Sequence, residues 1–354
     1  MQKVSDVLRW FDSNAPFSTA EDWDNVGLLL GDPAAPAQKV GVCLDATPSV
    51  LEQMIQDEVQ LVVSHHPLIF GALKKITVEN LSGRALLKMA QSGMSYIAAH
   101  TNWDFAPRGI NFELAKVLKL EDPQPLGHLP MDTFAAIVSY VPESHLQPVL
   151  DAMAAAGAGA IGDYDRCAFY SPGTGTFRPL EGADPYVGKV GEVETTSEIR
   201  LEVVCPPALL PTVLDAHHRA HPYEEPAVFA EVTQIARRGS LSYWGKHSPC
   251  SAKELATLVS ERLGGAVRVF GPEDATVASV AVVGGSGSGF WKLASSLDRP
   301  VLVTGEVKHH DGLEAAEAGV VVIEAGHAET EEPGMKWMAK LLSSDLAFAA
   351  RFYR

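Results

Sequence analysis

Short apolar runs alternate with amphipathic segments along the first third of the chain, and this alternation restricts the fold more than any other feature of the sequence. The apolar runs have the length of strands, and the segments between them have the 3.6-residue period of helices. Alternation at these lengths predicts a parallel sheet with crossover helices, an α/β fold. The expected strands are 39–45, 60–66 and 94–100, and the expected helices are 3–13, 49–58, 82–93 and 111–120.

The alternation stops at residues 121–130, where prolines and a glycine gather. Such a segment indicates a domain boundary. The region that follows contains an internal repeat, because a shift of 64 residues superimposes 142–152 on 206–216, with VLDA in both copies. Two strand–helix–strand copies predict a ferredoxin-like β-α-β-β-α-β insert, an α+β domain at 126–236.

From residue 237 the α/β alternation returns, and its pattern resembles that of the first third. Each part has a His-His pair after a strand, at 65–66 and at 309–310. Each part also has a later strand that runs into a histidine followed four positions on by an acidic residue. We therefore expect residues 1–125 and 237–354 to be related α/β halves of one metal-binding domain, interrupted by the insert.

Charge and composition argue against several classes of partner. Asp and Glu number 44 against 28 Lys and Arg, which gives a formal net charge of −16. This surface would repel a phosphate backbone, so we expect no nucleic-acid partner. No apolar run approaches the roughly 20 residues of a membrane span. The four cysteines lack short paired spacing, and the first residues lack an apolar signal segment. We expect a cytoplasmic protein without a membrane partner.

Histidines and acidic residues at the predicted strand ends form the strongest candidate site. Open α/β sheets place ligands at the carboxyl ends of their strands, and imidazoles and carboxylates bind divalent metals. Adjacent His65 and His66 point in different directions and would serve two metals, with Asp104 completing the first. A helical turn would put His327 and Glu331 on one face. His327 would then hold the second metal, and Glu331 would bridge both.

Two metal ions about 3.5–4 Å apart can share and activate a water molecule. Ligation by His and carboxylate without thiolate suits zinc, iron(II) or manganese and does not choose among them. Each of these candidate ligands also has a purely structural interpretation. The His pair can be a polar loop end, Asp104 can cap the following helix, and His327 with Glu331 can form a solvated first turn.

Other polar residues near the strand ends are candidates for supporting roles. His100, His309 and His310 occupy related positions in the two halves. We expect His100 and His309 to transfer protons, contact substrate or orient the ligands. Glu306 and Asp311 flank the second pair, and they are either orienting groups or solvated loop carboxylates.

Three further motifs favour structural roles. The glycine-rich segment 284–289 follows a strand, where backbone amides can hold an anion, but its spacing is not that of a nucleotide-binding loop. A tight packing turn is the stronger interpretation. The segment 23–27 is interpreted as a turn before an apolar run, with pocket lining as the alternative. The segment 221–226 contains metal-capable groups, but its prolines favour an irregular connection.

Several motifs together resemble the GTP cyclohydrolase I type 2 homologue family, also called the NGG-one-interacting-factor-three-like family. The opening segment 20–32 is similar to that of these proteins. Segments 171–194 and 220–232 resemble the longer members, which carry a central PII-like or CutA-like insert. The other motifs are SHHPLIF at 64–70, HTNWD at 100–104, TGEVKHHD at 304–311 and GHAETEEPG at 326–334.

The resemblance implies a dinuclear metal site and a ring-like homohexamer. On matching positions, His65 and Asp104 would bind one metal, His66 and His327 the other, and Glu331 both. One departure concerns the last motif, where family members usually have an aromatic residue after the histidine. Ala328 and Glu329 fill the two positions after His327 here, so the shape and charge of the pocket, and with them the substrate, are not carried over.

Two functions follow from these features. The first is a metal-dependent hydrolase that acts on a nucleotide-like or phosphorylated small molecule. The second is a non-catalytic regulator, a scaffold that handles metal and whose PII-like insert senses a ligand.

Overall fold

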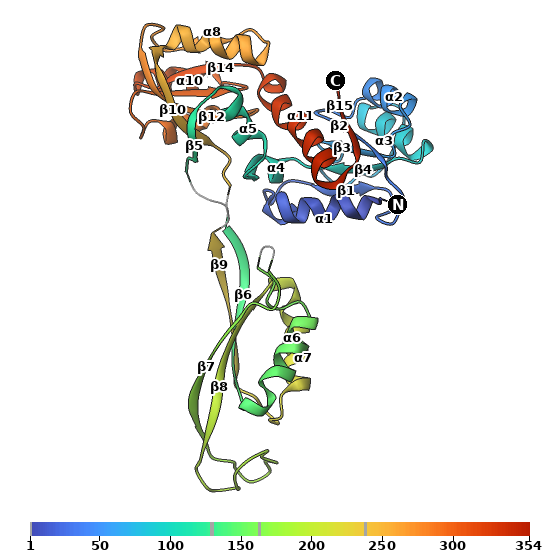
Figure 1. Cartoon of the computed structure of the whole chain (residues 1–354), viewed down its shortest axis with the longest axis vertical. Coiled ribbons are helices and arrows are strands. Elements are labelled where there is room, and N and C mark those ends of the chain that lie inside the picture. The colour runs from blue at the N-terminus through green and yellow to red at the C-terminus, as the bar shows by residue number, and fades with distance from the viewer. Residues whose placement is uncertain (1, 128–130, 162–163, 237–238) are drawn as a thin grey trace. The chain divides into compact units, whose positions relative to one another are not determined.

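The chain forms two compact units in the computed structural model, which describes residues 2–127, 131–161, 164–236 and 239–354. Met1–Pro130 and Arg237–Arg354 together make one unit, and Met131–Ala236 makes the other (Figure 1). The larger unit contains two sheets, each with helices on both faces, and the smaller unit contains one sheet. The mixed α/β fold expected from the sequence is confirmed.

The first sheet of the larger unit has the strand order β1-β4-β3-β2-β15. Strands β2, β3 and β4 are parallel, as the alternation predicts, and β1 runs antiparallel to β4. Helices α1, α4 and α11 cover one face, and α2 and α3 cover the other. The elements are α1 Val4–Asn14, β1 Gly27–Leu30, β2 Lys39–Cys43, α2 Pro48–Gln56, β3 Leu61–Ser64, α3 Leu81–Gln91, β4 Ser95–Ala98, α4 Thr101–Phe105, α11 His327–Leu346 and β15 Ala349–Tyr353.

The second sheet has the order β11-β14-β13-β12-β10-β5. Its first four strands repeat the arrangement of β1-β4-β3-β2, with β12, β13 and β14 parallel and β11 antiparallel to β14. The two sheets therefore share strand order and strand directions over these four strands. The elements are α5 Ile110–Val117, β5 Glu121–Pro125, β10 Tyr243–Ser251, α8 Ala252–Leu263, β11 Arg268–Phe270, β12 Thr276–Val283, α9 Trp291–Ala294, β13 Pro300–Thr304, α10 His309–Glu317 and β14 Val321–Glu324.

The two halves exchange elements. Strand β15 pairs in parallel with β2 of the first sheet, while β5 pairs antiparallel with β10 of the second. Helix α5, from the first half of the sequence, packs on the second sheet, and α11 packs on the first. Residues 121–125 were expected to belong to an irregular boundary; in the structure they form an edge strand.

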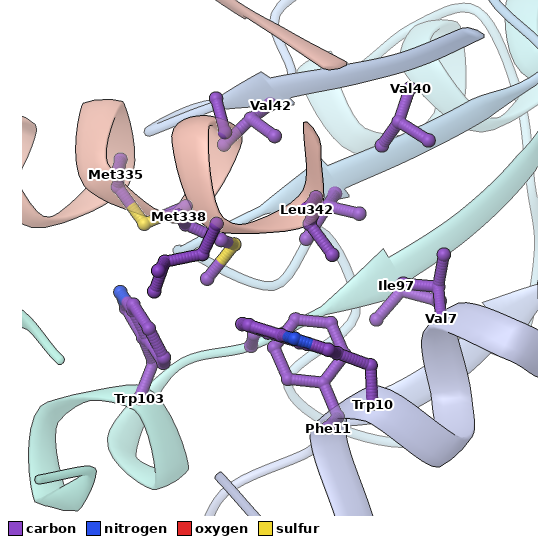
Figure 2. Close-up of a cluster of buried hydrophobic side chains, with 14 of the residues drawn as sticks. Val7, Trp10, Phe11, Val40, Val42, Ile97, Trp103, Met335, Met338 and Leu342 are labelled. Carbon is purple, nitrogen blue, oxygen red and sulfur yellow. The ribbon is translucent and has the colours of Figure 1, made fainter. Parts of the chain in front are cut away.

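Helix α11 is anchored by a buried apolar cluster (Figure 2). Met335, Met338 and Leu342 extend from α11 toward α1 and α4, where they meet Trp10 and Trp103. The centroids of the two tryptophan rings lie 6.0 Å apart. Fully burying side chains of this size stabilises a fold by about 1.5–3 kcal/mol each. This packing holds α11 against the first sheet.

The smaller unit has the order of elements β-α-β-β-α-β. Its antiparallel sheet has the order β7-β8-β6-β9, and α6 and α7 pack on one core with it. Pro142 and Pro206, equivalent in the repeat, have the same backbone angles within a degree (φ −54°, ψ 137°) before their helices. The elements are β6 Met131–Val141, α6 Leu146–Ala155, β7 Ala168–Phe177, β8 Glu194–Cys205, α7 Leu210–Ala220 and β9 Val228–Ala236.

Candidate metal centre

The carboxyl ends of β3 and β4 carry three of the candidate histidines. Strand β3 ends at Ser64, and the backbone amides of His65 and His66 continue its pairing with carbonyls of Cys43 and Leu44 at 3.1 Å each. His100 follows β4 and is the N-cap of α4. Parallel pairing of β3 with β4 therefore brings all three rings together, with centroids 5.0–5.7 Å apart.

Two helices supply the remaining candidates. Asp104 lies inside α4, where its amide bonds to the His100 carbonyl at 3.1 Å, so it is not the N-cap of the following helix. Helix α11 begins at His327, and Glu331 lies one turn later on the same face. The expected helical spacing of His327 and Glu331 is thus present. The helix continues from this turn to Leu346.

Three histidines surround the Glu331 side chain, which is only 6% exposed, and one of them also lies beside Asp104. The Glu331 oxygens lie 3.7 Å from His65 Nε2, 3.2 Å from His66 Nε2 and 3.2 Å from His327 Nε2. Asp104 Oδ1 lies 3.6 Å from His65 Nε2. All five predicted metal ligands are therefore in one cluster, which we call the Glu331 cluster: His65, His66, Asp104, His327 and Glu331.

These separations suit neighbouring metal ligands, and the two from His65 Nε2, at 3.6 and 3.7 Å, are too long for hydrogen bonds. Hydrogen bonds between nitrogen and oxygen have heavy-atom distances of about 2.7–3.2 Å. Neighbouring ligands of a tetrahedral ion with bonds near 2.0–2.1 Å lie about 3.3 Å apart. His66 Nε2 and His327 Nε2 also face each other at 3.3 Å. Two groups of three residues have ligand atoms that all lie within 4.8 Å of one another inside the group. One group is His66, His327 and Glu331, and the other is His65, His66 and His100.

The outer nitrogen of each imidazole is already occupied. His65 Nδ1 donates to the Ala99 carbonyl at 3.0 Å, and His66 Nδ1 lies 2.9 Å from Asp45 Oδ1. His327 Nδ1 lies 3.1 Å from Glu306, which also accepts from Ser286 at 2.6 Å. A proton on Nδ1 leaves a lone pair on Nε2, and this is how proteins orient metal-binding histidines. Three lone pairs then converge on one carboxylate.

Two polar atoms at the centre are buried without a hydrogen-bond partner. They are His65 Nε2 and Glu331 Oε2, and the His65 side chain is fully buried. A buried polar atom without a partner costs about 1–3 kcal/mol. A cation between these atoms would satisfy both, so the residues present fit a divalent metal.

The pKa values of the cluster reflect concentrated negative charge. Burial, aided by the Glu331 charge, raises the pKa of Asp104 to about 6 although His65 opposes the shift. Burial disfavours protonated His66, but the nearby Asp45 and Glu331 carboxylates outweigh burial and raise its pKa to about 10. Burial also works against ionised Glu331, yet the surrounding histidines hold its pKa well below the usual value. Protons therefore occupy the ring nitrogens where a cation would bind, and cation binding would release them.

Comparison with known proteins identifies the family. The family model for Duf34/NIF3 (NGG1p interacting factor 3) matches residues 2–353. The chain belongs to the Duf34/NIF3 family. A Bacillus subtilis protein named GTP cyclohydrolase 1 type 2 homolog is 36% identical over 324 residues, which are 91% of this chain and 87% of that protein. A Mycobacterium leprae protein of the same name is 36% identical over 360 residues, covering 98% of this chain and 91% of that one.

Solved structures of Duf34/NIF3 proteins have the same fold. A Bacillus cereus protein related to NIF3 superimposes with a TM-score of 0.73 at 31% identity, covering 99% of this chain and 96% of that one. A Staphylococcus aureus protein has a TM-score of 0.79 at 27% identity, with coverage of 99% and 95%. The family resemblance predicted from the sequence motifs is confirmed. Ala328, at the position where the motif departs from the family, is partly buried against the core of the first sheet.

His100 and His309, the two predicted proton carriers, lie in different surroundings. The ring of His100 faces those of His65 and His66, and its Nδ1 lies 3.0 Å from Asp24 Oδ1. His309 begins α10 and is exposed, and neither it nor His310 belongs to the two candidate ligand groups found among the described residues. The structure thus brings His100, and not His309, to the Glu331 cluster.

Two acidic residues that contact the ring Nδ1 of a site histidine, Asp24 and Asp45, were not predicted from the sequence. The Asp24 side chain is fully buried and also accepts from the Thr101 amide at 3.0 Å and from its hydroxyl at 2.5 Å. Burial opposes its charge, but the bonds to His100 and Thr101 lower its pKa to about 2. Asp45 follows β2 at the same edge of the sheet as His65 and His66, a position that could have identified it.

The glycine-rich segment 284–289 is a packing turn. Its amides at Gly284, Gly285 and Gly287 donate to the side chains of Asn111, Thr330 and Thr304 at 2.7–3.0 Å. These amides are therefore not available to an anion. In the segment 221–226, His221 has a structural role. Both of its ring nitrogens are hydrogen-bonded to backbone atoms, at 3.0 and 3.1 Å.

The sequence predicts no apolar run long enough for a membrane span. Among the helices in the described ranges, none is long and apolar enough to cross a bilayer.

Proposed function

We propose that the Glu331 cluster binds two divalent metal ions and that the chain is a metal-dependent hydrolase of a nucleotide-like or phosphorylated small molecule. His65 and Asp104 would hold one ion, and His66 and His327 the other. Glu331 would contribute to both, since its carboxylate lies beside His65 as well as beside His66 and His327. Zinc, iron(II) and manganese all suit this set of ligands.

The observation that carries the proposal is the position of the Glu331 carboxylate. It is buried, and three imidazole nitrogens lie 3.2–3.7 Å from its oxygens. In the absence of cations this arrangement needs protons on the rings. Divalent ions would replace those protons and satisfy the buried nitrogen of His65, which has no partner.

His100 is the proposed proton carrier. Two bound ions would supply Lewis acidity and a lowered pKa for water. Asp24 fixes the His100 ring through Nδ1 and so leaves Nε2 as the atom that exchanges a proton with the substrate. Trp23 and Phe70 offer apolar contact to a flat substrate. The centroid of each ring lies 5.9 Å from that of the His100 ring. His309 is the weaker candidate because it is exposed at the start of α10.

The test compares Glu331→Gln with Glu329→Gln, a matched variant in the same turn of α11. Elemental analysis of the purified wild-type chain should give two equivalents of metal, and Glu331→Gln should lose most of it because the bridging charge is removed. Glu329→Gln should retain it. Turnover of guanine nucleotides, other phosphoesters and cyclic amides by metal-loaded protein should fall in step with metal content.

His100→Gln separates chemistry from metal binding in the same assay. We expect full metal content with kcat lowered by about 10²–10⁴-fold, the usual contribution of general acid–base catalysis. A Glu331→Gln variant with unchanged metal content would rule out the dinuclear assignment. Activity that survives the loss of metal would rule out the hydrolase mechanism.

A second candidate function is a regulatory scaffold that senses a ligand through the smaller unit. It is favoured by the independent core of residues 131–236 and by a large cavity within that unit. From the family resemblance we also propose a ring-like homohexamer without nucleic-acid or membrane partners. Light scattering on the purified chain would measure its mass against 37.9 kDa for one chain.

A further inference from the structure

The smaller unit contains a cavity of about 870 Å³ that no step of the proposed hydrolase uses. Its walls come from β7, from the following loop as far as Val187, from β8, from the segment after α7 and from Tyr140 of β6. Ligand pockets commonly enclose about 300–1,000 Å³. The volume is therefore that of a site for a small molecule.

Backbone contacts hold the wall of the cavity in place. The loop between β7 and β8 is closed on itself by the Gly191 amide, which donates to the Pro179 carbonyl at 2.8 Å. It is tied to the segment after α7 by the Asp184 amide, which donates to Glu224 at 3.0 Å. The cavity is thus a formed feature of this unit.

A buried carboxylate lies in the cavity wall. Glu198 is only 9% exposed, and its Oε1 accepts from the Tyr223 hydroxyl at 2.8 Å. Its Oε2 lies against Gly175, where a Cβ would come within 2.3 Å and would displace the carboxylate. Arg200, which also lines the cavity, is bonded at 2.8 Å to Glu202. An ionised carboxylate has about four acceptor positions, and burial makes unfilled ones costly.

Aromatic rings surround this carboxylate. Tyr223 lies 6.0 Å from Tyr186 and 6.2 Å from Phe177, measured between ring centroids. All three line the cavity, together with four glutamates and two arginines. Aromatic faces and carboxylates attract cations, and the excess of glutamates repels phosphates and other anions.

We propose that this cavity binds a small organic cation, with a guanidinium or ammonium group on Glu198 and its carbon chain against Phe177, Tyr186 and Tyr223. The charged group completes the hydrogen bonding of the buried carboxylate, and the rings add cation–π contact. The site is independent of the metal centre. A small organic cation would then be the ligand that the smaller unit senses in the regulatory scaffold.

Isothermal titration calorimetry of the full chain tests the proposal, with agmatine and spermidine as cationic probes and citrate as the anionic control. At least one cation should bind, and citrate should not. Glu198→Gln, which keeps the shape and the acceptor for Tyr223, should weaken binding roughly 10- to 100-fold. Glu231→Gln, an exposed residue of β9 outside the cavity, should leave it unchanged.

Tyr186→Leu is the second variant, because Tyr186 is 55% exposed and its replacement leaves the core intact. Loss of one aromatic face should weaken binding about two- to fivefold. Glu331→Gln should bind the cation normally, and Glu198→Gln should keep its metal content, so failure of either proposal is distinguishable. The proposal is overturned if neither cation binds at about 10 mM, if citrate binds as well as the cations, or if Glu198→Gln has no effect.

Discussion

Three histidines of the Glu331 cluster use their two nitrogens in the same way. In each, Nδ1 is engaged by a fixed acceptor, and Nε2 points at the Glu331 carboxylate. The acceptors differ in burial, because the Ala99 carbonyl bonds a fully buried ring while the Asp45 side chain is 58% exposed. Orientation of the rings therefore depends on residues that would never touch a metal.

Asp45→Asn should weaken metal binding by about 10- to 100-fold, the usual cost of removing the acceptor behind a metal-binding histidine. The amide is a weaker acceptor for His66 Nδ1–H, and the ring loses both its orientation and basicity. Competition with a fluorescent chelator measures the affinity. Glu52→Gln, which removes an exposed charge on α2, is the control. Equal affinities for all three proteins would show that Asp45 does not support the site.

The residues of the candidate site were predictable where they recur at strand ends. His65, His66, Asp104, His327 and Glu331 were found from spacing and from the edge of the sheet on which strands end. Asp24 was interpreted as a turn residue, because its bond to His100 spans 76 positions and leaves no local pattern. His309 was expected to resemble His100 in role, but the start of α10 leaves it exposed.

At the scale of elements, the turn after β12 shapes the site without binding anything. Gly285 has a φ of +60°, and a Cβ there would lie 2.3 Å from Glu331 Oε1 and 3.3 Å from His327 Nε2. Gly285→Ala should therefore displace Glu331 and lower metal content. The backbone strain should cost about 1–2 kcal/mol of stability.

Gly289→Ala is the matched control for this turn, because a Cβ at Gly289 meets no atom within 4 Å. Elemental analysis and thermal unfolding of both variants measure the two effects. Full metal content in Gly285→Ala would mean that the turn can move away from Glu331.

The core of the smaller unit carries a buried histidine that should make its stability depend on pH. His217 is buried beside Ser139, whose hydroxyl lies 2.7 Å from its Nε2. Burial, with the neighbouring His221 and His218, lowers the pKa of His217 to about 4 from 6.5. Between these values the unfolded chain binds the proton and the folded chain does not. Stability is therefore full above pH 6.5 and falls as the pH drops toward 4.

From pH 7.5 to pH 5 the free energy of opening should fall by about 2 kcal/mol for His217 alone. Burial also lowers the pKa of His221, which adds a loss of the same sign. Amide hydrogen-exchange protection in β6 and α7 measures local opening of this unit. His217→Gln, which retains a polar group near Ser139, should remove most of the pH dependence. The same dependence in wild type and variant would contradict this assignment.

The exchanged strands set the limit on prediction of the fold. The parallel strands were predictable because they are apolar runs between helices. Residues 121–125 contain two prolines and two acidic residues, which disfavour strands, yet β5 forms at the edge of a sheet, where proline is tolerated. Strand β15 pairs with residues more than 300 positions earlier, for which sequence periodicity contains no signal.

At the scale of the whole molecule, the smaller unit should be removable. Met131 and Ala236 are paired neighbours in β6 and β9, so the points where the chain enters and leaves this unit are adjacent. Replacing 131–236 by a short Gly-Ser linker should leave the larger unit folded with its metals, since the Glu331 cluster lies wholly within that unit. Circular dichroism and elemental analysis check this. A metal-free but folded product would show that the smaller unit takes part in metal binding.

Strand β15 has a consequence for how the protein is made. On the ribosome, residues 27–98 emerge early, but the edge of their sheet beside β2 stays unpaired until residues 349–353 have been synthesised. The smaller unit has no such dependence, because all of its strands come from 131–236. The middle of the chain should therefore complete its core before the amino-terminal sheet does, although it is synthesised later. In the meantime the nascent amino-terminal sheet is exposed to chaperones.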